Sequence, residues 1–141
     1  MTLRAAAFLA GALWGLLGWG LGGKAYTGGL WGGIVAAPFI GVIVSAALQP
    51  RFEATEGWRR WLVALCSLYL GATLFALAIG VTDALTGHPA RNALEVVFGA
   101  VLGTWWGVTL TGFLIALWPL AYLTHIVLGW ADDLSPNRGA S

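Results

Sequence analysis

Long uncharged segments divide this chain into four parts. Stretches without Asp, Glu, Lys or Arg run over residues 5–23, 25–50, 61–82 and 96–131. Each reaches the roughly 18 to 20 residues that an α-helix needs to cross a bilayer core about 30 Å thick. The pattern therefore predicts four transmembrane helices, over residues 4–23, 28–49, 59–82 and 94–118.

The second of these segments would not be helical in water. GGLWGGIVAAPFIGVIVSA, residues 28–46, holds five glycines and a proline, and in a helix glycine costs about 1 kcal/mol and proline about 3 kcal/mol relative to alanine. In hydrocarbon an unpaired backbone amide costs more than either, so a spanning segment stays helical. The composition agrees, because 59% of the residues are hydrophobic and 9% are charged, whereas a soluble domain is about 25% charged.

Small residues recur every four positions in the predicted spans. Residues four apart share a helix face, and such a ridge lets two helices pack closely in lipid. The ridges either hold the four helices together or leave one face for a partner chain or a second copy. The glycines expected at such contacts are Gly11, Gly15, Gly29, Gly33, Gly41, Gly99, Gly103 and Gly107.

Short connections and prolines organise the predicted spans. About four residues join the first two, which forces an antiparallel hairpin, and a second hairpin follows. We expect Pro50 to end the second helix, and Pro119 either to kink the fourth helix or to begin an interfacial helix over 119–131. The result is an all-α integral membrane protein with one domain, residues 1–131, and a flexible tail over 132–141.

The basic residues give an orientation. Arg4, Arg51, Arg59, Arg60 and Arg138 fall on one side of a four-span chain, and Lys24 and Arg91 on the other. The positive-inside rule then puts both termini in the cytoplasm, N-in/C-in, and we expect a bacterial inner membrane. The first apolar run, about 19 residues, is longer than the h-region of a cleaved signal peptide, so we expect a retained helix.

Reactive groups are scarce in the predicted spans. Ionisable residues inside a membrane mark ion paths or substrate sites, and this chain has none of the charged types near a span centre. Asp83, His88, Arg91 and Glu95 are expected to form a polar cluster at the outer surface. We find no catalytic constellation and no metal-ligand spacing, and a net charge of +1 gives no reason to expect nucleic acid. The prediction is a protein that is not an enzyme.

Three tryptophans are expected near the middle of the membrane. Trp14, Trp105 and Trp106 lie about 15 Å deep when counted along straight helices. Their rings either fill space beside glycines or stack on a flat or polyene ligand such as a pigment, a quinone or a lipid chain.

His125 is the most notable single residue of the sequence. In LAYLTHIVLGW it follows Ala121 by four positions, and over about ten residues this resembles the Ala-x-x-x-His stretch around the bacteriochlorophyll ligand of purple-bacterial light-harvesting polypeptides. The resemblance implies a pigment or haem ligand. A straight helix from Val96 would instead place His125 about 43 Å along, at the cytoplasmic headgroups, where it would serve as a hydrogen-bonding residue.

These observations lead to three hypotheses of function. The first is a non-enzymatic accessory or assembly subunit of a larger membrane complex, which contacts lipid and other transmembrane chains or copies of itself. The second is a small oligomeric channel or carrier for an uncharged or lipid-like solute. The third is a pigment- or haem-binding subunit that uses His125 and the deep tryptophans. Pigment, haem and lipid are therefore the candidate ligands, and none of them is required by the sequence.

Overall fold

Helices form nearly all of the part of the chain that the computed structural model describes, which is residues 2–22, 24, 29–86, 92–114 and 117–134, and this part contains no strand. The elements are α1 (Leu3–Leu21), the π-helical η2 (Gly29–Val35), α2 (Ala37–Ala54), α3 (Trp58–Thr86), α4 (Ala93–Leu114) and α5 (Leu117–Asp133). The predicted all-α fold class is confirmed.

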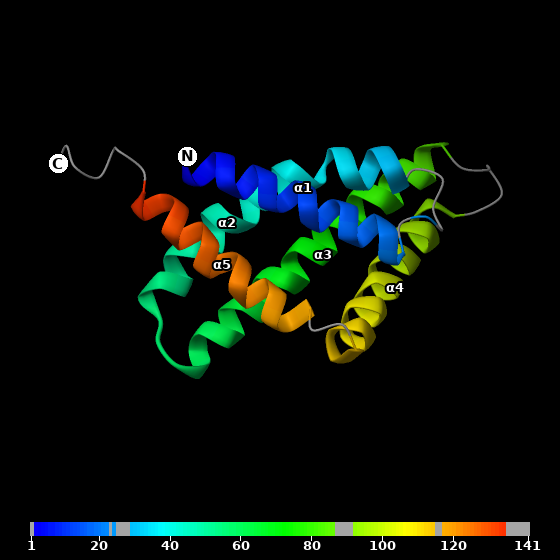
Figure 1. Cartoon of the computed structure of the whole chain (residues 1–141). Helices are drawn as coiled ribbons and strands as arrows, with labels where there is room; N and C mark the ends of the chain where they lie inside the picture. The colour runs from blue at the N-terminus through cyan, green and yellow to red at the C-terminus, as the bar shows by residue number, and fades with distance from the viewer. Residues whose placement is uncertain (1, 23, 25–28, 87–91, 115–116, 135–141) are drawn as a thin grey trace.

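The helices run between two ends of the molecule (Figure 1). α1 leads from one end to the other, η2 and α2 return beside it, and α3 crosses diagonally to the far end. α4 comes part of the way back, and α5 completes the return next to α1. Ala6 and Ala7 near the start of α1 pack on Leu128 and Ala131 near the end of α5, so the beginning of the first helix and the end of the last lie together.

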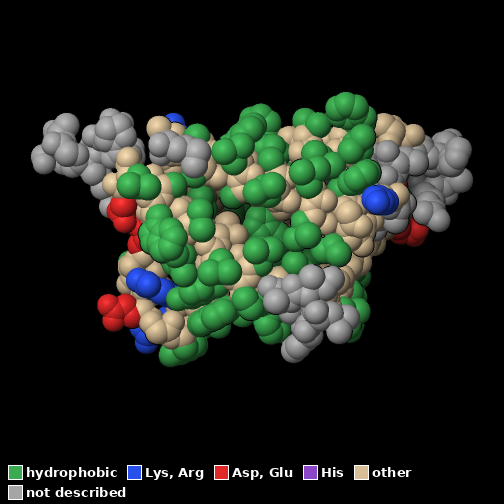
Figure 2. Space-filling model, viewed as in Figure 1, with side chains coloured by type: hydrophobic (Ala, Val, Ile, Leu, Met, Phe, Trp, Pro, Cys, Tyr) green, Lys and Arg blue, Asp and Glu red, His purple; other side chains and the backbone are tan. Residues whose placement is uncertain are grey.

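Within the described residues, three helices are long and apolar enough to cross a membrane: Leu3–Leu21, Trp58–Thr86 and Ala93–Thr111. Figure 2 shows hydrophobic side chains over the middle of one face, and charged side chains near its two ends. This distribution is typical of a protein whose middle lies in lipid. The structure supports a membrane protein with three such helices.

The second predicted span differs most from the structure. Residues 29–35 form a π-helix, a turn follows at Ala36, and the α-helix begins only at Ala37. Pro38 occupies the first turn of α2, where its missing N–H has no intrahelical partner to lose. The expected uniform helix over 28–49 is therefore two elements.

Pro50 does not end a helix as expected, whereas Pro119 lies at the start of a separate helix, which was one of its two predicted places. Pro50 lies inside α2, which continues to Ala54. The last turns of α2 carry Gln49 and Phe52, both buried against α5, and this packing offsets the cost of the proline. α4 ends at Leu114 and α5 begins at Leu117, so Pro119 lies within the first turn of a separate helix.

The last helix, α5, packs against the rest of the bundle along one face. Its residues Leu117, Ala121, His125, Leu128 and Ala131 are buried and recur at intervals of three or four, which places them on one face. This face contacts α1, α2 and α3. α5 is a packed member of the bundle.

Glycines set the closest helix contact. A Cβ atom built on Gly41 would lie 2.5 Å from the Ala7 carbonyl oxygen and 2.6 Å from the Gly11 Cα atom. Gly11 meets the backbone of α2 in the same way. α1 and α2 therefore touch backbone to backbone, which only residues without a side chain allow.

Candidate functional site

A cavity of about 390 Å³ lies in the centre of the bundle, with walls from all five α-helices. Its volume is within the roughly 300–1,000 Å³ of small-molecule sites. None of the described residues that line it is Asp, Glu, Lys or Arg. Most are small or aliphatic, so the wall suits an uncharged, largely apolar ligand.

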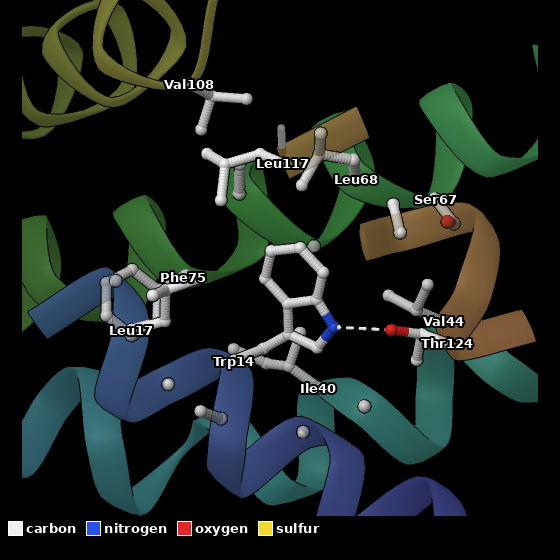
Figure 3. Close-up of a pocket in the computed structure, with 18 of the residues that line it drawn as sticks. Trp14, Leu17, Ile40, Val44, Ser67, Leu68, Phe75, Val108, Leu117 and Thr124 are labelled. Atoms are coloured by element: carbon white, nitrogen blue, oxygen red, sulfur yellow. Dashed lines mark hydrogen bonds between the residues drawn. The ribbon is translucent and has the colours of Figure 1, made fainter. Parts of the chain in front are cut away.

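Trp14 is the largest side chain on this wall. Figure 3 shows its ring extending from α1 into the cavity, with Leu68 and Leu117 on one side and Ile40 on the other. Its indole Nε1 donates a hydrogen bond of 3.2 Å to Thr124 Oγ1 of α5. The polar atom of the ring is thus satisfied within the protein, and the ring presents an apolar surface to the cavity.

His125 closes one part of the cavity and joins three helices. The side chain is 4% exposed, its Nδ1 lies 2.7 Å from Gln49 Oε1 of α2, and its Nε2 lies 2.7 Å from Ser67 Oγ of α3. Gln49 Nε2 also donates to the His125 carbonyl oxygen at 3.1 Å. His125 is therefore buried inside the bundle, as a hydrogen-bonding residue that joins α5 to α2 and α3.

The hydrogen-bond network accepts His125 in more than one protonation state. Gln49 Oε1 can only accept, so Nδ1 carries a proton. Ser67 Oγ has one proton and two acceptors within reach, Nε2 and the Ala64 carbonyl oxygen at 2.7 Å. Its hydroxyl can donate to Nε2 of a neutral ring, or accept from a protonated ring and donate to Ala64. Every polar atom of the cluster keeps a partner in either case.

Aromatic rings cover the outer side of this cluster. The Phe52 ring stacks on His125 with centroids 4.8 Å apart and an interplanar angle of 17°. Trp61 stacks on Tyr122 at 4.3 Å, also at 17°. These contacts tie α2 and α3 to α5, so the end of the cavity beside His125 is closed.

Both ring nitrogens of His125 are occupied, which bears on the pigment hypothesis. A metal ligand needs one ring nitrogen free for the metal. Here each nitrogen has a partner at 2.7 Å. The arrangement does not fit axial ligation of a haem or a bacteriochlorophyll without breaking one of these bonds.

The other predicted tryptophans lie away from Trp14. Trp105 Nε1 donates to Thr73 Oγ1 of α3 at 2.8 Å, and the ring is 45% exposed. Trp106 is 66% exposed. Neither lines the cavity, so the structure brings His125 and Trp14 to one site and leaves the tryptophan pair on the side of α4.

The predicted packing glycines divide into three groups. Gly11, Gly15 and Gly41 lie where α1 meets α2. Gly99, Gly103 and Gly107 belong to α4. A Cβ atom at Gly99 or Gly107 would have no atom within 4 Å, and Gly103 and Gly107 line the cavity. Gly29 and Gly33 belong to η2, but their surroundings lie outside the described part of the structure.

The outer polar cluster is only partly visible. Asp83 lies near the end of α3 and Glu95 in the first turn of α4, where a negative charge favours the helix N-terminus. His88 and Arg91 lie outside the described residues. The structure therefore puts two of the four residues at one end of the bundle.

Sequence reasoning missed the partners of His125. Neither Gln49, which lies next to Pro50, nor Ser67, which lies within an apolar span, was singled out from the sequence. Thr124 was not singled out either. One signal was present: Gln49 is an amide side chain at the end of an uncharged segment of 26 residues, 25–50, and a polar group there needs a partner. Which partner it meets depends on the fold.

Comparisons with known proteins add no relative, since no protein family, curated protein sequence or solved structure matches this chain.

Proposed function

We propose that this chain is a non-enzymatic integral membrane protein that binds an uncharged, lipid-like molecule inside its helix bundle and acts as a carrier for it. The observation that carries the proposal is the central cavity, whose described lining residues include no Asp, Glu, Lys or Arg. An apolar cavity inside helices that themselves suit lipid would take up molecules dissolved in the bilayer.

The internal hydrogen bonds favour an uncharged ligand. Trp14 is bonded to Thr124, and His125 to Gln49 and Ser67. A charged solute would lose its hydration without gaining an opposite charge, and this costs several kcal/mol or more. An ion channel or an ion-coupled carrier is therefore the less favoured form of this hypothesis.

The same proposal includes the position in the membrane. α1 makes the first crossing, η2 and α2 together the second, α3 the third, and α4 with α5 the fourth. Both termini then lie on the side that holds Arg4, Arg51, Arg59 and Arg60, which the positive-inside rule makes the cytoplasm of a bacterium. Figure 1 shows α4 starting at the end of the bundle where α3 finishes and α5 ending at the opposite end, next to the start of α1, and this supports the four-crossing arrangement.

A second candidate function has one specific observation in its favour. Only 6% of the most apolar window of α4 is buried, and Gly99 has open space around it. A helix face of this kind suits another transmembrane chain, in line with an accessory or assembly subunit. Co-purification of one defined partner in stoichiometric amount, lost in Gly99→Leu, would favour this function over the carrier.

Extraction of bound molecules tests the carrier proposal. Gly71 lines the cavity from α3, and a Cβ atom there would lie 4.0 Å from Val44 Cγ2, so Gly71→Leu fills the cavity without an immediate backbone clash. We expect the wild type, purified gently from native membranes, to release an apolar molecule that mass spectrometry detects, and Gly71→Leu to release much less.

Gly99→Leu is the matched control, because it adds the same side chain in open space outside the cavity. Equal amounts of extracted apolar molecules from the wild type and Gly71→Leu would refute the proposed binding site.

A further inference from the structure

The cavity has its mouth between two helices. Of the thirty residues that line it, the exposed ones are Leu21 and Gly22 at the end of α1, and Gly103 and Gly107 in α4. All other lining residues are buried or partly buried. The opening therefore faces sideways out of the bundle, between the C-terminal end of α1 and the middle of α4.

Helix contacts close the remaining sides. α1 packs on α2, η2 and α5, and α4 packs on α3 and α5, whereas α1 and α4 make no comparable contact. At the mouth the two helices present glycine, and a Cβ atom at Gly22 or Gly107 would meet nothing within 4 Å. Because glycine has no side chain, neither residue narrows the mouth of the cavity.

The cavity is long and closed at its far end. Its wall follows α1 from Ala7 to Gly22, about 22 Å at 1.5 Å per residue. The deep end lies beside Leu128 and the His125 cluster, where the stacked rings of Phe52 and His125 join α2 to α5. A volume of about 390 Å³ spread over this length suits one extended chain better than a compact ring system.

A positive charge lies just beyond the mouth. Lys24 follows Gly22 by two residues, and its Nζ atom is 4.9 Å from the centroid of the Trp19 ring. A lysine and a tryptophan at the end of a membrane helix mark the level of the headgroups. A phosphate could be held there while an attached hydrocarbon chain extends into the cavity.

We infer that one hydrocarbon chain of a membrane phospholipid enters the cavity sideways, between α1 and α4, from the leaflet that contains Lys24. This inference rests on the proposed function and names its ligand class and its route. In the N-in/C-in orientation that leaflet is the outer one. The chain reaches Trp14 and Leu68, and the headgroup stays at the bilayer surface.

Photolabelling in vesicles tests the route. The full chain is reconstituted in phosphatidylcholine–phosphatidylglycerol vesicles that contain a phospholipid with a diazirine near the end of one acyl chain. After irradiation, peptide mass spectrometry compares the label on Trp14 inside the cavity with the label on Trp106, which is 66% exposed and serves as the lipid-facing standard. We expect both to be labelled in the wild type.

Substitutions at the mouth should separate the two signals. In Gly107→Leu and in Gly22→Leu we expect the Trp14-to-Trp106 ratio to fall roughly tenfold, which corresponds to about 1.4 kcal/mol of lost binding. Gly99→Leu and Gly20→Leu are the matched controls on the same helices, because both positions have open space and neither lines the cavity. They should keep the wild-type ratio, and labelled lipid confined to the leaflet of Lys24 should suffice for the Trp14 signal.

Each outcome decides between named possibilities. An unchanged ratio in both mouth variants would overturn the lateral route. An unlabelled Trp14 in the wild type, with an apolar molecule still extracted in the Gly71→Leu comparison, would overturn the phospholipid chain and leave the carrier in place. An unlabelled Trp14 together with no extracted molecule would overturn both. Since the two mouth variants lie on different helices, one correctly folded variant is enough.

Discussion

At the scale of single residues, His125 is the polar centre of the bundle. It is hydrogen-bonded to Gln49 and Ser67 on two other helices. Replacing His125 or Gln49 leaves one buried polar atom, Gln49 Oε1 or His125 Nδ1, without its hydrogen-bond partner, at a cost of about 1–3 kcal/mol. We expect His125→Phe and Gln49→Leu each to lower the free energy of unfolding by this amount, measured by denaturant titration in detergent micelles.

The double variant is the sharper measurement. Residues that share a hydrogen-bond network couple by about 0.5–3 kcal/mol, so His125→Phe with Gln49→Leu should cost less than the sum of the single changes. Thr86→Ala is the control, since Thr86 is exposed and bonds only within its own helix in the described structure. Strict additivity of the two single changes would show that the network does not hold the helices together.

Gly41 offers a second residue-scale prediction. A methyl group there would meet the backbone of α1 at 2.5 Å from Ala7 and 2.6 Å from Gly11, and backbone cannot move aside as a flexible side chain does. Gly41→Ala should therefore lower the free energy of unfolding by about 1–3 kcal/mol, as overpacking does. Thermal unfolding in detergent, followed by circular dichroism, measures this.

The same exchange at Gly99 should have the opposite sign. The position has no atom within 4 Å of a new Cβ, and alanine is the better helix former by at most about 1 kcal/mol. An equal loss of stability in Gly41→Ala and Gly99→Ala would mean that the α1–α2 contact is not the closest point of the bundle.

Sequence spacing indicated which residue types would matter, but not which residues would meet. Gly11 and Gly41 stood out because small residues recur at every fourth position, a local pattern. The meeting of His125, Gln49 and Ser67 joins positions up to 76 residues apart in sequence, and no local pattern encodes it. Trp14 and His125 were both candidate ligand contacts, yet their place on one cavity wall follows from the bend between α4 and α5.

At the scale of elements, two prolines should respond oppositely to alanine. Pro50 is inside α2, where it removes a hydrogen bond and its ring crowds the preceding turn. Pro119 is in the first turn of α5, where the N–H would lack an intrahelical partner anyway. We expect Pro50→Ala to raise the free energy of unfolding by about 1–3 kcal/mol, and Pro119→Ala to change it by less than about 0.5 kcal/mol.

Denaturant titration of both variants under one set of conditions gives the comparison. If Pro119→Ala were strongly stabilising, Pro119 would be acting as a helix-interior kink, and the start of α5 at Leu117 would be misplaced. The wild-type chain and Gly99→Ala bracket the range expected for changes outside the helix contacts.

The helix boundaries show why the elements were only partly predictable. The apolar runs indicated the first and third helices within a few residues, because one uncharged segment became one helix in each case. The second run became η2 and α2, and the fourth became α4 and α5. Hydropathy reports the solvent around a segment and not its backbone geometry, so a single run can contain a turn.

At the scale of the whole molecule, the four-crossing arrangement makes a prediction about sides. In a Cys66→Ala background, Glu56→Cys between α2 and α3 and Lys24→Cys beyond α1 should lie on opposite faces of the membrane. An impermeant thiol reagent should label Lys24→Cys in right-side-out vesicles, and Glu56→Cys only in inverted vesicles.

Thr2→Cys is the internal check, because the first residues of α1 should share the side of Glu56. Labelling of Glu56→Cys and Lys24→Cys from the same side would contradict four crossings. Labelling on opposite sides but in the reverse vesicles would keep the crossings and reverse the N-in/C-in orientation.

The contact between α1 and α2 also shapes the cavity, because Gly11, Gly15 and Gly41 belong to both. The two helices already touch through their backbones, so they cannot approach further and should tilt as one rigid pair when the bilayer thins. Such a tilt answers hydrophobic mismatch at a modest free-energy cost and would change the distance from α1 to α4. The occupancy of the cavity should therefore depend on the acyl-chain length of the host membrane, which would make this protein sensitive to bilayer thickness.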